Sequence, residues 1–208
     1  MSEQKRKMIW NIVAAILLLS VLIVTALGIR SVIDRKERYA NSTEYVEVDY
    51  LPDGYTYTRD AFFDVQYIRT NGYREEMEYP MVKIIRSRDE LNAYYEEYKD
   101  DYYLERKEQV FADTTIGFLD ACDRYNEEYF KDQILILVLL EEGSGSIRHE
   151  VSKVRVTEKK GERTVNISIS TRVPETVTDD MAQWHLLIEL EEGLDVEDES
   201  HINVGWRS

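Results

Sequence analysis

The stretch Gln133–Val151 reads QILILVLLEEGSGSIRHEV, and the rest of the fold is organised around it. It opens with an uninterrupted apolar run, Ile134–Leu140, that is too short to cross a bilayer. A short apolar run bounded by turn residues predicts a strand that is buried on both faces. The Gly/Ser segment 143–146 predicts a loop, and Ile147–Glu158 predicts a strand that returns beside the first, with a bulge near Ser152.

Hydrophobic periodicity predicts the other elements of the domain. The capping box Ser87–Glu90 predicts the start of a helix over 88–104, and a second helix is expected over 114–130. We expect both helices to cover the buried strand. Because helices and strands are segregated along the chain, the pattern indicates an α+β fold with a mainly antiparallel sheet and two packed helices. Further strands are expected at Phe63–Arg69, Met81–Arg86, Thr164–Val173, Ala182–Leu190 and His201–Arg207.

The N-terminal region predicts a single-pass membrane protein. Ile9–Ile29 contains no charged residue, and its 21 residues are enough, as a helix, to cross a hydrocarbon core of about 30 Å. Because segment 1–8 is very short and the long following region is acidic, we expect the N-terminus in the cytoplasm. Residues 30–60 would then form a juxtamembrane linker or hairpin, and 61–208 one extracytoplasmic domain. The main alternative is a cleaved signal peptide, although its apolar region is usually only about 7–15 residues long.

Charge and cysteine content exclude several classes of protein. The chain has 26 Lys/Arg and 41 Asp/Glu residues, and all but three of the acidic residues follow residue 38. Such an acidic domain repels phosphate backbones, so we expect no nucleic-acid partner; a cationic peptide or a basic protein surface suits it better. Cys122 is the only cysteine, so no intrachain disulfide is possible. The neighbouring Asp120 and Asp123 oppose formation of a reactive thiolate.

The Gly/Ser loop and two histidines are the candidate ligand-binding residues. The loop is either an exposed backbone nest for an anion or a peptide carboxylate, or a plain turn between two strands. It lacks the lysine of a P-loop. A zinc site or a hydrolase would need the histidines to converge with acids or with Ser144, and the sequence contains no spacing that predicts this. We therefore expect no catalytic residue, metal or cofactor. The candidate binding residues are Gly143, Ser144, Gly145, Ser146, His149 and His185.

The C-terminal half resembles the C-terminal domain of the PrcB subunit of a bacterial cell-surface protease complex. The segments that carry the resemblance are ILILVLLEEGSGSIRHEV (Ile134–Val151), TVNISISTRVP (Thr164–Pro174), MAQWHLLIEL (Met181–Leu190) and, upstream, IIRSRDELNAYY (Ile84–Tyr95). The family's loop is usually of a Thr-Gly-Gly-Tyr kind, and Gly143–Ser146 stands in its place here. The resemblance implies a non-catalytic, complex-associated role in a membrane-anchored protein of Firmicutes, clostridial in character, and it supplies no catalytic residues to carry over.

We therefore expect a membrane-anchored, extracytoplasmic protein-interaction module of the bacterial envelope, acting as a subunit or modulator of a surface complex. Its partner would be an envelope protein or a peptide. The alternative is an extracytoplasmic sensor domain, in which the tyrosine-rich face of Leu91–Tyr102 and the sheet hold a small ligand or a cation. The same tyrosine face also fits simple packing on the sheet, with the hydroxyl groups at its rim.

Overall fold

The computed structural model describes residues 56–72, 74, 77–106 and 115–207. The chain divides into two compact units, Met1–Glu47 and Val48–Ser208, and all described residues belong to the second. The expected membrane span, 9–29, lies outside the described residues. Among those that are described, no helix has the length and apolar character needed to cross a membrane.

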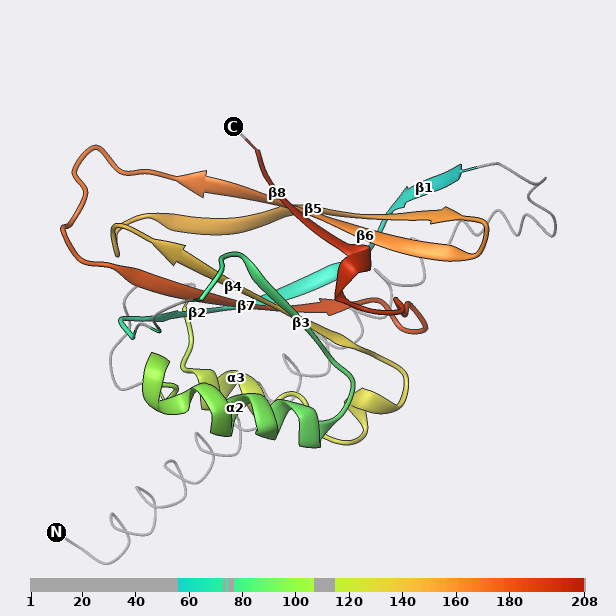
Figure 1. The fold of residues 1–208 in the computed structure, drawn as a ribbon, viewed down its shortest axis with the longest axis horizontal. Helices are drawn as coiled ribbons and strands as arrows, with labels where there is room; N and C mark the ends of the chain where they lie inside the picture. Colours follow the sequence, from blue (N-terminus) through green and yellow to red (C-terminus); the bar gives the residue numbers. More distant parts are fainter. Residues whose placement is uncertain (1–55, 73, 75–76, 107–114, 208) are drawn as a thin grey trace, which may run out of the picture. The chain divides into compact units, whose positions relative to one another are not determined.

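The described domain is α+β and contains two four-stranded sheets (Figure 1). The outer sheet has the strand order β1-β5-β6-β8, and the central sheet has the order β2-β7-β4-β3. Neighbouring strands are antiparallel except β6 and β8, which are parallel. The strands of the outer sheet are β1 (Thr56–Asp60), β5 (Arg148–Lys159), β6 (Glu162–Arg172) and β8 (Ile202–Arg207). Those of the central sheet are β2 (Phe63–Thr70), β7 (Ala182–Leu190), β4 (Leu135–Glu142) and β3 (Met81–Ile85). The helices are α2 (Arg88–Tyr102), α3 (Phe118–Cys122), η1 (Tyr129–Lys131) and η2 (Glu199–His201).

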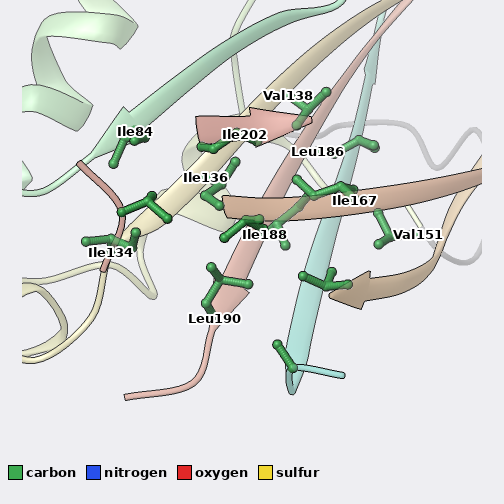
Figure 2. Close-up of a cluster of buried hydrophobic side chains, with 14 of the residues drawn as sticks. Ile84, Ile134, Ile136, Val138, Val151, Ile167, Leu186, Ile188, Leu190 and Ile202 are labelled. Atoms are coloured by element: carbon green, nitrogen blue, oxygen red, sulfur yellow. The ribbon is translucent and has the colours of Figure 1, made fainter. Parts of the chain in front are cut away.

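The layers follow from the two faces of the central sheet. One face packs on the outer sheet, and the other is covered by α2 and α3 (Figure 1). Successive residues of β7 alternate between the two: Leu186 and Ile188 enter the inter-sheet core, whereas His185 and Leu187 face the helices. Figure 2 shows the inter-sheet core, where side chains of both sheets meet. The single sheet that the sequence suggested is therefore two sheets, because the chain crosses from one to the other between β1 and β2.

The apolar run of β4 is buried on both faces, as predicted. Leu135 to Leu140 are each at most 2% exposed. Helices cover only one of its faces, however, and the outer sheet covers the other. The strand pairs with β3 on one side and β7 on the other, so its backbone is also enclosed by hydrogen bonds. The run is therefore explained by packing alone.

The start of α2 confirms the predicted cap, whereas the second helix is much shorter than predicted. The Ser87 hydroxyl accepts a hydrogen bond from the Glu90 amide at 3.1 Å, and the Glu90 carboxylate accepts one from the Arg86 amide at 2.6 Å. The helix predicted over 114–130 is reduced to α3, a turn, and η1. The Arg88 guanidinium donates to the carbonyl groups of Cys122 and Tyr125, at 2.5 and 3.0 Å, and so supplies partners to carbonyl groups where α3 ends.

The hairpin between β5 and β6 also agrees with the sequence pattern. The predicted bulge lies between Val151 and Lys153. Lys160 and Gly161 form the turn with positive φ angles of 56° and 84°. Two consecutive residues with positive φ match the right-handed twist of a hairpin. Through this turn β6 returns beside β5, and the inward side chains of the hairpin lie in the inter-sheet core.

Candidate functional site

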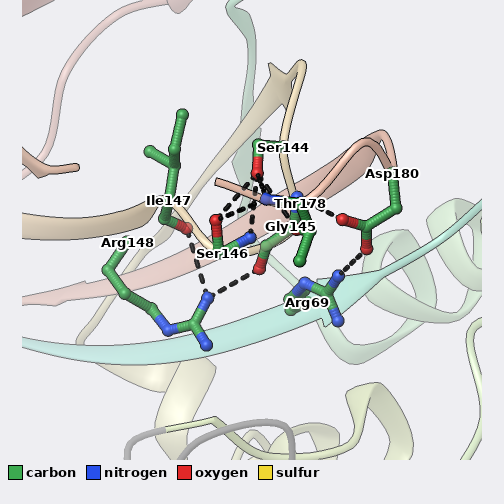
Figure 3. A network of polar contacts seen from close by, with 8 residues as sticks. All are labelled: Arg69, Ser144, Gly145, Ser146, Ile147, Arg148, Thr178 and Asp180. Atoms are coloured by element: carbon green, nitrogen blue, oxygen red, sulfur yellow. Dashed lines mark hydrogen bonds and ion pairs between the residues drawn. The ribbon is translucent and has the colours of Figure 1, made fainter. Parts of the chain in front are cut away.

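The loop between β4 and β5 is tied to the loop before β7 rather than open. Ser144 is 4% exposed. Its hydroxyl lies 2.8 Å from the Ser146 hydroxyl and accepts a hydrogen bond from the Thr178 amide at 3.0 Å (Figure 3). The Gly145 amide donates to the carbonyl oxygen of Asp180 at 2.7 Å and to its carboxylate at 3.1 Å. Because these groups already have partners within the chain, the loop between β4 and β5 is a junction with the loop between β6 and β7.

An ion pair between a buried arginine and a half-exposed aspartate adjoins this loop. The Arg69 side chain is 5% exposed, and its Nη2 lies 2.8 Å from the Asp180 carboxylate (Figure 3). Hydrogen bonds from Thr178 and the Gly145 amide, together with Arg69, lower the pKa of Asp180. A Cβ atom on Gly145 would lie 1.7 Å from Nη2 of Arg69, so a larger residue here would force the Arg69 side chain to move. Of the two glycines of this loop, Gly145 is closely packed, whereas a Cβ at Gly143 would meet no atom within 4 Å.

His149 points inward from β5 at the same end of the sandwich. Its side chain is 1% exposed, with Nε2 3.2 Å from the Glu142 carboxylate and Nδ1 3.3 Å from the Thr171 hydroxyl. The ring stands edge-on to Trp184 at 5.7 Å. Burial lowers the pKa of His149 to about 4, so the imidazole is neutral at pH 7. A neutral ring donates through one nitrogen and accepts through the other, and the contact with Glu142 is therefore not an ion pair.

His185 lies on the opposite face of the central sheet. It is completely buried, with aromatic neighbours in edge-on geometry: the ring centroids of Tyr94, Tyr102 and Phe118 lie 6.1, 5.3 and 5.8 Å away. Burial lowers the pKa of His185 to about 3. The structure therefore divides the candidate residues: loop 143–146 and His149 lie at the loop end of the sandwich, and His185 lies beneath the helices. The β-strand alternation of Trp184 and His185 already indicates this division.

The described side chains do not form the groupings that metal or hydrolytic chemistry would need. The Ser144 hydroxyl is bonded to Ser146 and Thr178, whereas His149 contacts Glu142 and Thr171. Across residues 56–72, 74, 77–106 and 115–207, no three His, Cys, Asp or Glu side chains gather as a metal site would require. Burial also raises the pKa of the Cys122 thiol to about 12, so it stays protonated.

Two open grooves cross the surface of the domain. One, of about 530 Å³, lies between β2 and the bulge of β5, and its walls carry Asp64 and Glu150. The other, of about 590 Å³, lies beside the turn before β4 and includes Arg86 and Asp195. Arg86 and Asp195 form an ion pair with each other, and Asp64 lies 3.5 Å from Arg124. Arg86, Asp195 and Asp64 therefore already have oppositely charged partners within the domain.

The edges of the sheets differ in how they are protected. On β2, the Asp64 carboxylate accepts a hydrogen bond from the Val65 amide at 3.0 Å, and the Ile116 amide donates to the Tyr67 carbonyl group at 2.9 Å. On β3, the Ile84 amide donates to the Glu199 carboxylate at 3.2 Å. Charged side chains that occupy backbone groups in this way prevent a further strand from adding. The edges of the central sheet are therefore capped.

The β8 edge of the outer sheet has no such protection. Within the part of the chain that the structure describes, β8 pairs with β6 alone, and the amide of its first residue, Ile202, donates to the Glu199 carbonyl group. The first five residues of β8, INVGW, carry no charge. Along the face toward the core, exposure rises from 7% at Ile202 to 52% at Trp206, because the cover from the central sheet ends. The sequence predicted this strand, and the alternation of Ile202, Val204 and Trp206 was the signal for its apolar face.

Comparison with known proteins adds no further assignment. No protein-family model, curated protein or solved structure matches the chain. The expected relation to the PrcB C-terminal domain therefore rests on the sequence segments quoted above.

Proposed function

We propose that the chain is a membrane-anchored, non-catalytic interaction module that docks an extended segment of another envelope protein along β8. The observation that supports the proposal is the uncapped β8 edge, which ends in a half-exposed Trp206. The anchor is the apolar segment Ile9–Ile29, which places the domain outside the cytoplasmic membrane. In this proposal loop 143–146, whose polar groups bond within the chain, has a structural role and is not the docking surface.

The docked segment would extend the outer sheet as a fifth strand. Its backbone would pair with the free edge of β8, and its alternate side chains would cover Trp206. No atom lies within 4 Å of the position that a Cβ would take at Gly205, so this face of β8 is open there. A single added strand forms a small contact for a protein interface, and we therefore expect a transient complex.

The net charge of the chain indicates which charge the segment docked on β8 should carry. The chain carries a formal net charge of −15, and the region after residue 38 contains most of the acidic residues. A second copy of the chain would bring the same charge and would be repelled, whereas a cationic segment would be attracted. The partner segment is therefore one in which Lys or Arg alternates with apolar residues.

A peptide of alternating lysine and valine tests this proposal. Isothermal titration with the full-length chain in detergent should show binding that weakens at least about tenfold in Trp206→Ala, because a central aromatic contact is lost. Val177→Ala is the matched control, since Val177 is 52% exposed in a loop away from the edge. Equal binding of a peptide with proline at its centre, or of wild type and Trp206→Ala, would refute docking on β8.

A further inference from the structure

A row of buried and half-buried polar side chains lies on the face of the central sheet that α2 and α3 cover. Strand register aligns Thr70 of β2, Gln183 of β7 and Glu141 of β4 across the helix-facing side of the central sheet. Thr70 is 8% exposed and Gln183 is fully buried. Neighbouring side chains on one face of antiparallel strands lie about 5 Å apart at their Cβ atoms. The three side chains therefore adjoin one another in a line.

His185 and Tyr94 extend this polar row toward the helix. His185 is two residues from Gln183 on the same face of β7, and its ring centroid lies 6.1 Å from that of Tyr94 on α2. The other rings around His185 belong to Tyr102 and Phe118, so the enclosure is aromatic. Within the described ranges, these buried polar atoms have no hydrogen-bonding partner: Thr70 Oγ1, Tyr94 Oη, Glu141 Oε2, Gln183 Nε2 and Oε1, and both ring nitrogens of His185.

Buried polar groups in folded proteins almost always find a partner, in the protein or in ordered water. The groups in this row include donors and acceptors, so a water molecule, which both donates and accepts, can bridge them. The aromatic enclosure of His185 favours a very small occupant. A charged occupant would be costly in such an apolar surrounding, as the lowered pKa of His185 illustrates.

We propose that the polar row Thr70–Gln183–Glu141, together with His185 and Tyr94, is an internal binding site for ordered water. In this site each water molecule bridges side chains of two or three strands, and α2 rests on the sheet partly through these bridges. This inference does not depend on the docking function of β8, which involves the other sheet.

A high-resolution crystal structure of the protein tests the site directly. The expected result is a water molecule within hydrogen-bonding distance of the Gln183 amide. Thermal unfolding of Gln183→Leu and His185→Phe gives an independent measurement. If water is bound, each variant should unfold at a lower temperature, because the remaining groups lose a bridge. If the site is dry, removing an unsatisfied polar group should raise the unfolding temperature.

Gln66→Leu is the matched control, because Gln66 lies on the same face but is only half-buried, and little change is expected. A dry site in the crystal, or a higher unfolding temperature for both variants, would overturn the proposal. If a variant fails to fold, the density at Gln183 in the wild-type protein still decides.

Discussion

Acidification from pH 7 to pH 5 should destabilise the domain through its two buried histidines. Burial lowers the pKa of His149 to about 4 and that of His185 to about 3, from 6.5. In the unfolded chain both rings take up protons as the pH falls through 6.5, while in the folded chain they stay neutral. The unfolded state therefore binds more protons between pH 6.5 and about 4, and the free energy of unfolding falls over this window.

The expected size of the loss follows from these values. Each histidine contributes about 2 kcal/mol between pH 7 and pH 5, and the two together about 4 kcal/mol. This is a large part of the 5–15 kcal/mol that is usual for a domain. Aspartates whose pKa is lowered by hydrogen bonds, such as Asp180 and Asp198, lose their stabilising effect only below about pH 4. The raised pKa of Glu142 acts in the opposite direction and reduces the loss slightly.

Urea unfolding of the full-length chain at pH 5, 6 and 7 measures this effect. Trp184 is a suitable fluorescent probe, because it is buried and lies 5.7 Å from the His149 ring. His149→Gln and His185→Gln should each remove about half of the pH dependence, whatever their effect on stability at pH 7. An unchanged free energy of unfolding between pH 7 and pH 5, or an undiminished pH dependence in both variants, would refute the reasoning.

Substitutions at three positions test the packing described above by denaturant unfolding. Gly145→Ala should cost about 2 kcal/mol, because the new Cβ displaces the Arg69 guanidinium from its ion pair; a neutral result would contradict the close approach. Ser87→Ala should cost about 1 kcal/mol through loss of the α2 cap, whereas Ser87→Asp should restore it. Tyr125→Phe should cost about 1.5 kcal/mol, because the buried Glu189 carboxylate loses a donor at 3.2 Å; unchanged stability would mean that solvent replaces it.

Local patterns predicted the elements of this domain well. The α2 cap, the β5 bulge and the buried β4 run each depend on a few neighbouring residues, and each is present in the structure. The helix expected over 114–130 is present only as α3 and η1, and the carbonyl groups of Cys122 and Tyr125 accept hydrogen bonds from Arg88, about 35 residues earlier in the sequence. On its expected face, Phe118, Cys122 and Tyr125 are nevertheless buried, and Tyr129 is half-buried.

The partition into two sheets and the role of the candidate loop could not be predicted locally. Period-2 alternation shows which face of a strand is buried, but it does not identify the neighbouring strand. The parallel pairing of β8 with β6 is an example. Likewise, Gly145 and Ser144 have the composition of an open anion-binding loop, and only the arrival of Asp180 and Thr178 from a distant segment engages them.

The strand order of the central sheet imposes a sequence of events on folding. β4 needs β7 as its neighbour, with Leu135 opposite Glu189, and β2 needs β7 with Phe63 opposite Leu190. The strand β7, which pairs with both β4 and β2, is therefore synthesised after them, and contacts of such long range form slowly. Until then the apolar run of β4 is exposed and prone to aggregate. A chain that crosses a membrane as it is made would thus depend on folding assistance until Leu190 has emerged.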